Sequence, residues 1–248
     1  MNKLAKLLIT FLCLLTVVIL FSCNTEKDIK VLLITGGHDY DKDGFNELLA
    51  KLPITYDHVE HPDAYAMLEP EKVAPYDVVL LYDMPKETTS STDRLFYRLG
   101  EAGKGIVVLH HAFCSYDFWP NYSKIIGGRY FRHGWRKNGI DQPASTYTHD
   151  VTFNVKVEDP NHPVTEGVKD FQITDETYGL IDIQPTVYPL LSTTEPSSAP
   201  LVGWTNIYLN SRVVTLTLGH DKNAWENPSF IKILSQAIKW TADKEEKK

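Results

Sequence analysis

The stretch KVLLITGGHD, residues 30–39, decides the fold. Residues 31–34 form a continuous apolar run that ends at a threonine and two glycines, as in a strand that is buried on both faces. Such strands are typical of parallel sheets whose two faces are covered by helices. The polar turn that follows, with His38 in it, would lie at the carboxyl end of the strand, where open α/β sheets bind ligands.

The same pattern recurs farther along the chain. Residues 77–82 (DVVLLY) and 105–109 (GIVVL) read as further buried strands, and residues 55–59 alternate as another strand. Residues 45–52 and 92–103 have the apolar spacing of helices. Strands that alternate with helices predict an α/β fold, with a mostly parallel sheet and helices on both faces.

Residues 127–200 do not follow this alternation. They contain an extended pair, residues 151–157 and 171–174, among many turn residues. Regular structure returns in residues 201–218, which predict a late β-hairpin, and in residues 229–240, which predict a closing amphipathic helix.

The first residues predict export. Lys3 and Lys6 precede an apolar run of fifteen residues over 7–21, shorter than the roughly 20 residues that span a bilayer. This describes a signal peptide over residues 1–22. The run ends LFSC, which resembles a bacterial lipobox with Cys23 as the lipid-modified first residue; an ordinary signal peptide that ends near a cysteine is the alternative. We expect a membrane-anchored lipoprotein of the cell envelope, periplasmic or surface-exposed.

Cysteine use and charge restrict the possibilities further. Cys13 would leave with the signal peptide and Cys23 would carry lipid, so Cys114 would be the only free thiol. The mature chain would then contain no intrachain disulfide, and its stability would come from a hydrophobic core. A net charge of −7 without a basic stripe argues against a nucleic-acid partner.

The expected organisation is a single large domain over residues 30–242. A short tether, residues 23–29, precedes the domain, and a charged tail, residues 243–248, follows it. This length is enough for one hydrophobic core.

Histidines follow several of the predicted strands. His38 follows the first strand, His110 and His111 end the fourth, and His220 follows the last, while Asp83 ends the third. A single histidine at a strand end is more often a hydrogen-bonded packing residue. Because the carboxyl ends of parallel strands share one edge, several such residues together indicate a functional site. Imidazole is the commonest metal ligand and titrates near neutral pH.

Six segments also resemble, in order, the motifs of the trehalose-utilisation (ThuA-like) family, a branch of the class I glutamine amidotransferase-like folds. They are residues 33–39, 105–112, 127–133, 159–167, 174–178 and 212–221. The resemblance covers residues 30–242 and implies a flavodoxin-like sheet of the glutamine amidotransferase type. It also implies a part in sugar catabolism, involving 3-keto sugars in some members, without a defined reaction.

The chain departs from the amidotransferases at their nucleophile. Those enzymes place a cysteine between glycines on a tight strand-to-helix turn, whereas here the strand runs into HHAFC, residues 110–114. Cys114 lies several residues late, and its neighbours Phe113 and Tyr116 indicate packing. A reactive thiolate needs a nearby base or a helix N-terminus. We therefore expect that the protein is not a glutamine amidotransferase.

With the resemblance, the pair Asp175–Glu176 becomes a candidate part of the site, although alone it would read as a surface turn. The predicted catalytic residues are His111, Glu176 and His38. The predicted ligand-binding residues are His110, Asp175, Tyr178 and Asp221. A divalent metal such as zinc is a further hypothesis, because it accepts imidazole and carboxylate ligands, although no HxH or HExxH spacing is present. Its candidate ligands are His38, His111, His133 and His220; no nucleotide cofactor is expected.

The functional hypothesis is an exported lipoprotein of carbohydrate catabolism that acts on a sugar, glycoside or keto-sugar through a His/Glu pocket. The alternative is a non-catalytic sugar-binding or scaffold lipoprotein, in which the same side chains only bind ligand hydroxyls. Turnover of a sugar would distinguish the two.

Overall fold

A nine-stranded sheet organises residues 28–243, the part of the chain that the computed structural model describes. From one edge to the other, the strands are β2 (Ile54–Glu60), β1 (Ile29–Gly36), β3 (Val78–Asp83), β4 (Gly105–Leu109), β13 (Ser211–Leu216), β12 (Leu201–Tyr208), β11 (Tyr188–Ser192), β8 (Thr146–Val157) and β9 (Phe171–Gly179). The predicted signal peptide, Cys23 and the last five residues of the charged tail lie outside the described residues.

The two halves of the sheet differ in direction. Strands β2, β1, β3, β4 and β13 pair in parallel. From β13 onward every pairing is antiparallel, beginning with the β12–β13 hairpin that was predicted from the sequence. The predicted α/β fold of the amidotransferase type is thus confirmed. Residues 127–200, which broke the sequence pattern, extend the same sheet with β8, β9 and β11.

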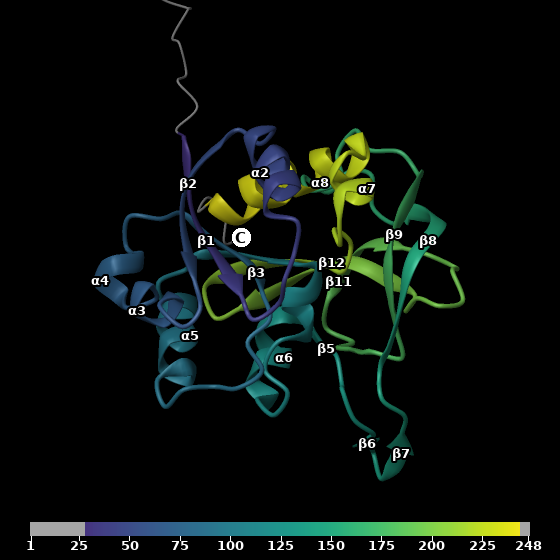
Figure 1. The fold of residues 1–248 in the computed structure, drawn as a ribbon, viewed down its shortest axis with the longest axis horizontal. Coiled ribbons are helices and arrows are strands. Elements are labelled where there is room, and N and C mark those ends of the chain that lie inside the picture. The colour runs from purple at the N-terminus through teal and green to yellow at the C-terminus, as the bar shows by residue number, and fades with distance from the viewer. Residues whose placement is uncertain (1–27, 244–248) are drawn as a thin grey trace, which may run out of the picture.

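Helices cover both faces of the sheet (Figure 1). One face carries α2 (Lys42–Ala50), α7 (Lys222–Trp225) and α8 (Pro228–Ala242). The other carries α3 (Ala64–Met67), α4 (Pro70–Val73), α5 (Thr92–Glu101) and α6 (Pro120–Ile126). None of the helices within residues 28–243 is long and apolar enough to cross a membrane.

The burial of β1 on both faces of the sheet explains why residues 31–34 are all apolar. Val31 and Leu33 belong to the core under α2 and α8, whereas Leu32 and Ile34 belong to the core under α5 and α6. All four side chains are at most 2% exposed. Full burial of each stabilises the fold by roughly 1.5–3 kcal/mol, so an apolar residue at every position follows from the architecture.

The closing helix α8 has a start signal in its sequence. The side chain of Asn227 accepts hydrogen bonds from the backbone N–H groups of Ser229 and Phe230, and Pro228 occupies the first turn. An asparagine cap followed by proline is a favoured helix N-terminus, because the first N–H groups have no partner within the helix. The helix therefore begins one residue before the predicted start.

Short elements connect the two halves. The 3-10 helix η1 (His110–Cys114) follows β4 directly. The small ladder of β5 (Gly128–Arg129) and β10 (Asp182–Ile183) lies beside α6, and the hairpin of β6 (Trp135–Lys137) and β7 (Ile140–Gln142) projects away from the sheet (Figure 1).

The contact between β4 and α8 provides a test of the fold. A Cβ atom added at Gly105 would lie 2.5 Å from the carbonyl oxygen of Thr241. Gly105→Ala should therefore lower the free energy of unfolding by about 1–3 kcal/mol, the usual cost of overpacking. Chemical denaturation measures this free energy of unfolding. Gly134→Ala is the matched control, since its Cβ would lie 3.4 Å from its nearest neighbour. Equal stability of the two variants would contradict this packing.

Candidate active site

The site begins where β4 ends. His110 follows the strand with a φ of +49°, a left-handed conformation that is uncommon for a residue with a Cβ. Its side chain is fully buried, and that of the next residue, His111, is 3% exposed. Strained backbone of this kind costs of order 1–3 kcal/mol and is often found at functional sites.

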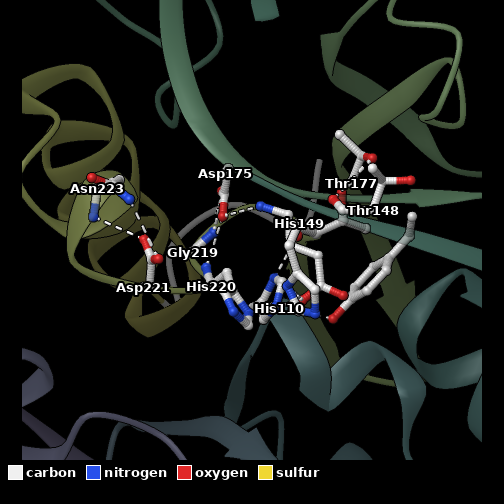
Figure 2. Close-up of polar contacts among 12 residues, drawn as sticks. His110, Thr148, His149, Asp175, Thr177, Gly219, His220, Asp221 and Asn223 are labelled. Carbon is white, nitrogen blue, oxygen red and sulfur yellow. Dashed lines mark hydrogen bonds and ion pairs between the residues drawn. The ribbon is translucent and has the colours of Figure 1, made fainter. Parts of the chain in front are cut away.

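His110, Glu176 and His220 form a triad at the centre of the site, and Figure 2 shows His110 and His220 close together. Nε2 of His110 lies 3.2 Å from Oε2 of Glu176 and 3.0 Å from Nδ1 of His220. The same two atoms of Glu176 and His220 are 2.8 Å apart. On the other side of its ring, Nδ1 of His110 donates to the carbonyl oxygen of Thr217 at 2.8 Å. The triad joins η1, β9 and the loop after β13.

Asp175 holds that loop in place. Its carboxylate accepts hydrogen bonds from the backbone N–H groups of Gly219 at 2.7 Å and His220 at 2.9 Å (Figure 2). Gly219 has a φ of +109°, and a Cβ there would lie 2.9 Å from the ring of Phe230, so the turn requires glycine. Burial raises the pKa of Asp175, while the charge of His110 and these N–H groups oppose that shift. Asp175 therefore positions His220.

A cavity of about 220 Å³ borders the triad. It is lined by His38, Met84, His111, Cys114, Tyr130, Arg132, Tyr147, His149, Glu176 and Tyr178. The three predicted catalytic residues, His38, His111 and Glu176, thus lie on one pocket although they come from distant segments. The rings of His38 and His111 stack with their centroids 4.8 Å apart. Nε2 of His111 donates to the carbonyl oxygen of Tyr82 at 3.2 Å, so Nδ1 is the basic nitrogen of the neutral ring.

The protonation of the pocket follows from its contacts. Burial, reinforced by His110 and His38, lowers the pKa of His111 well below its usual value. Burial alone would raise the pKa of Glu176, but its hydrogen bonds to His110 and His220 outweigh burial and lower the pKa well below the usual range. The hydrogen bond to Glu176 raises the pKa of His220. These shifts favour a neutral His111 and an ionised Glu176 in the same cavity.

The thiol of Cys114 is buried at the edge of the pocket. Burial raises the pKa of Cys114 to about 12, so almost no thiolate exists at neutral pH. This agrees with the missing nucleophile turn in the sequence.

The other predicted residues have varied positions. Tyr178 lines the pocket, and its hydroxyl lies 3.0 Å from Nε2 of His110. Asp221 is the N-cap of α7, where it accepts from the N–H of Asn223 at 2.8 Å. His133 is exposed and is not among the residues that line the pocket. Asp83 contacts His61 at 2.7 Å instead of the pocket.

Sequence reasoning missed His149, which lines the pocket with its Nδ1 3.8 Å from Oε2 of Glu176. The residue comes from within β8, where the register against β9 shifts between Thr148 and Val151. The shift coincides with a left-handed residue, Asp150, at a φ of +57°. No strand-end motif marks this position, so only the pairing of β8 with β9 reveals it.

Comparisons with known proteins agree with this architecture. A ThuA-like protein from Parabacteroides merdae ATCC 43184 superposes with a TM-score of 0.73 at 21% sequence identity, over 90% of this chain and 92% of that one. A ThuA-like protein from Bacteroides uniformis ATCC 8492 does so with a TM-score of 0.66 at 19% identity, over 89% and 95%. A β-galactosidase from Rahnella sp. R3 has a TM-score of 0.57 at 11% identity, over 86% of this chain but 31% of that one.

These identities show a shared fold. No curated protein sequence matches the chain. The model of the ThuA family, described as trehalose utilisation, matches residues 30–241. Since this match covers most of the sequence, the chain belongs to the ThuA family.

Proposed function

We propose that the protein is an enzyme of carbohydrate catabolism that acts on a sugar, glycoside or keto-sugar in the pocket beside the triad. The observation that carries the proposal is the meeting of His38, His111 and Glu176 on one cavity. Membership of the trehalose-utilisation family supports a carbohydrate as the ligand.

The size and lining of the cavity suit a single sugar ring. Its volume of about 220 Å³ is below the roughly 300–1,000 Å³ of pockets for drug-sized ligands. A disaccharide would therefore keep one ring outside. The exposed Tyr147 offers its hydroxyl to the sugar, while Tyr130 and Arg132 line the cavity with polar groups that also bond to the protein.

The proposed chemistry is proton transfer. A neutral His111 accepts a proton at Nδ1 from a sugar hydroxyl or from a carbon next to a carbonyl, and such catalysis contributes typically about 10²–10⁴-fold. The carboxylate of Glu176 orients the substrate and stabilises positive charge that develops on a neighbouring imidazole. If the pocket only binds sugars, the same groups act as hydrogen-bonding partners without turnover.

The first test is turnover of trehalose and its 3-keto derivative, followed by NMR of the products. His111→Ala should reduce the rate by about 10²–10⁴-fold, whereas the exposed histidine variant His133→Ala should behave as wild type. Cys114→Ala should keep most of the activity, because its thiol is protonated. Binding of these sugars without any conversion would favour the binding protein, and complete loss of turnover in a folded Cys114→Ala variant would indicate a thiol nucleophile.

The protonation of His111 predicts a pH dependence. A base must be neutral to act, and lowering its pKa moves the loss of activity to lower pH. The midpoint of the acidic limb of the rate profile should therefore lie below pH 6.5, the ordinary pKa of histidine. NMR of the imidazole nitrogens in ¹⁵N-labelled protein should show His111 titrating with a midpoint below that value. A midpoint at or above pH 6.5 would contradict the assigned role.

The proposal also makes the protein a lipoprotein of the cell envelope. Its support is the sequence of residues 1–23, which end in a lipobox-like cysteine. Lipid acylation at Cys23 would anchor the chain through burial of about 0.8 kcal/mol per CH₂ group.

Cell fractionation tests the anchor. Cys23→Ser should release the protein from membranes or leave its signal peptide uncleaved, because no lipid can then be attached. Cys13→Ser, a matched change within the predicted signal peptide, should be processed as wild type. Normal processing and membrane partition of the Cys23→Ser variant would remove the lipoprotein assignment.

A further inference from the structure

Three ligand atoms of the triad converge on one point. Nε2 of His110, Oε2 of Glu176 and Nδ1 of His220 are separated from one another by 2.8–3.2 Å. The rings of His110 and His220 meet edge to face, with their centroids 5.0 Å apart. A triangle of this size leaves a point roughly 2 Å from all three atoms, which is the metal–ligand distance of zinc sites.

A hydrogen bond outside the triad orients the ring of His110 toward that point. Because Nδ1 of His110 donates to the carbonyl oxygen of Thr217, the ring turns its other nitrogen, Nε2, toward the triad. The carboxylate of Glu176 presents Oε2 to the same point. Acceptor atoms this close repel each other unless protons or a cation lie between them.

We propose that His110, Glu176 and His220 bind one divalent cation, zinc or a metal of similar ligand preference. Two imidazoles and one carboxylate are a ligand set that zinc uses in catalytic sites, where three protein ligands leave a position open. Glu176 also lines the cavity, so the cation borders the space where a sugar would bind. There it would polarise a carbonyl or hydroxyl oxygen of the substrate.

The surroundings of the triad resemble the outer sphere of a metal site. Histidine ligands almost always donate their second ring N–H to a carbonyl or carboxylate, as His110 does to Thr217. Asp175 fixes the backbone of His220. This site differs from the ligands predicted from the sequence: it shares His220 with them but uses His110 and Glu176, whereas His38 and His111 stack as rings.

This inference deepens the proposed function. Binding of the cation does not depend on that function, but its role in sugar chemistry rests on it. The test uses the full chain, purified in detergent without chelator or nickel, then freed of metal and titrated with zinc chloride by calorimetry. One ion per chain should bind. The melting temperature of the protein should rise with zinc, because an ion that binds only the folded state stabilises it.

The decisive variant is His220→Asn, because this side chain is 25% exposed and its replacement disturbs folding least among the three. It should weaken zinc binding by more than the roughly 10–100-fold that loss of an outer-sphere partner costs. It should also abolish the zinc-dependent rise in melting temperature. His133→Asn and His38→Ala are the controls and should bind zinc as wild type does.

The outcomes separate the two proposals. No saturable zinc binding, or wild-type affinity in His220→Asn, would overturn the cation site, and the triad would then be a network held by protons. Loss of zinc through His38→Ala or His133→Asn would also overturn it. Sugar turnover without zinc binding would leave the proposed function standing alone, whereas zinc binding without turnover would leave only the cation site.

Discussion

Two consecutive buried carboxylates, Asp175 and Glu176, impose the constraint on which the site depends. Both lie in β9 and are at most 7% exposed. A buried carboxylate without partners is so costly that it must be hydrogen-bonded, paired or protonated. Asp175 accepts hydrogen bonds from backbone N–H groups in the loop after β13, and Glu176 contacts two imidazoles. The outermost antiparallel strand is thereby tied to the end of the parallel half, and removal of one member of such a buried pair typically costs about 3–5 kcal/mol.

The fold alone does not define the reaction. The same architecture is found in ThuA-like proteins and within about a third of a β-galactosidase chain. Function must therefore be argued from the site. Here the site combines an imidazole and a carboxylate whose pKa values are both lowered with a buried thiol, in a cavity of about 220 Å³. An amidotransferase site depends on a reactive cysteine, whereas burial raises the pKa of the Cys114 thiol to about 12.

The sequence predicted the parallel half well, because β1, β3 and β4 are apolar runs that end at or just before glycine, aspartate and histidine, respectively. The same rule brought His38 and His111 to one pocket, and His220 to its neighbouring triad. Glu176 was selected through the family resemblance, since β9 has no periodic signal that would show a buried carboxylate. His149 and the role of Asp221 as a helix cap depend on local geometry, a register shift and a turn, that composition does not encode.

The sequence separation of the triad has a consequence for how the protein gains and loses its site. His110 lies 66 residues from Glu176 and 110 residues from His220. Contacts this distant form only after long loops have closed, and such closure is slow. The pocket is thus completed only when the parallel and antiparallel halves of the sheet are both in place. A ligand bound in the pocket would therefore contact residues from both halves of the sheet. Its binding should slow hydrogen exchange in strands at both ends of the sheet.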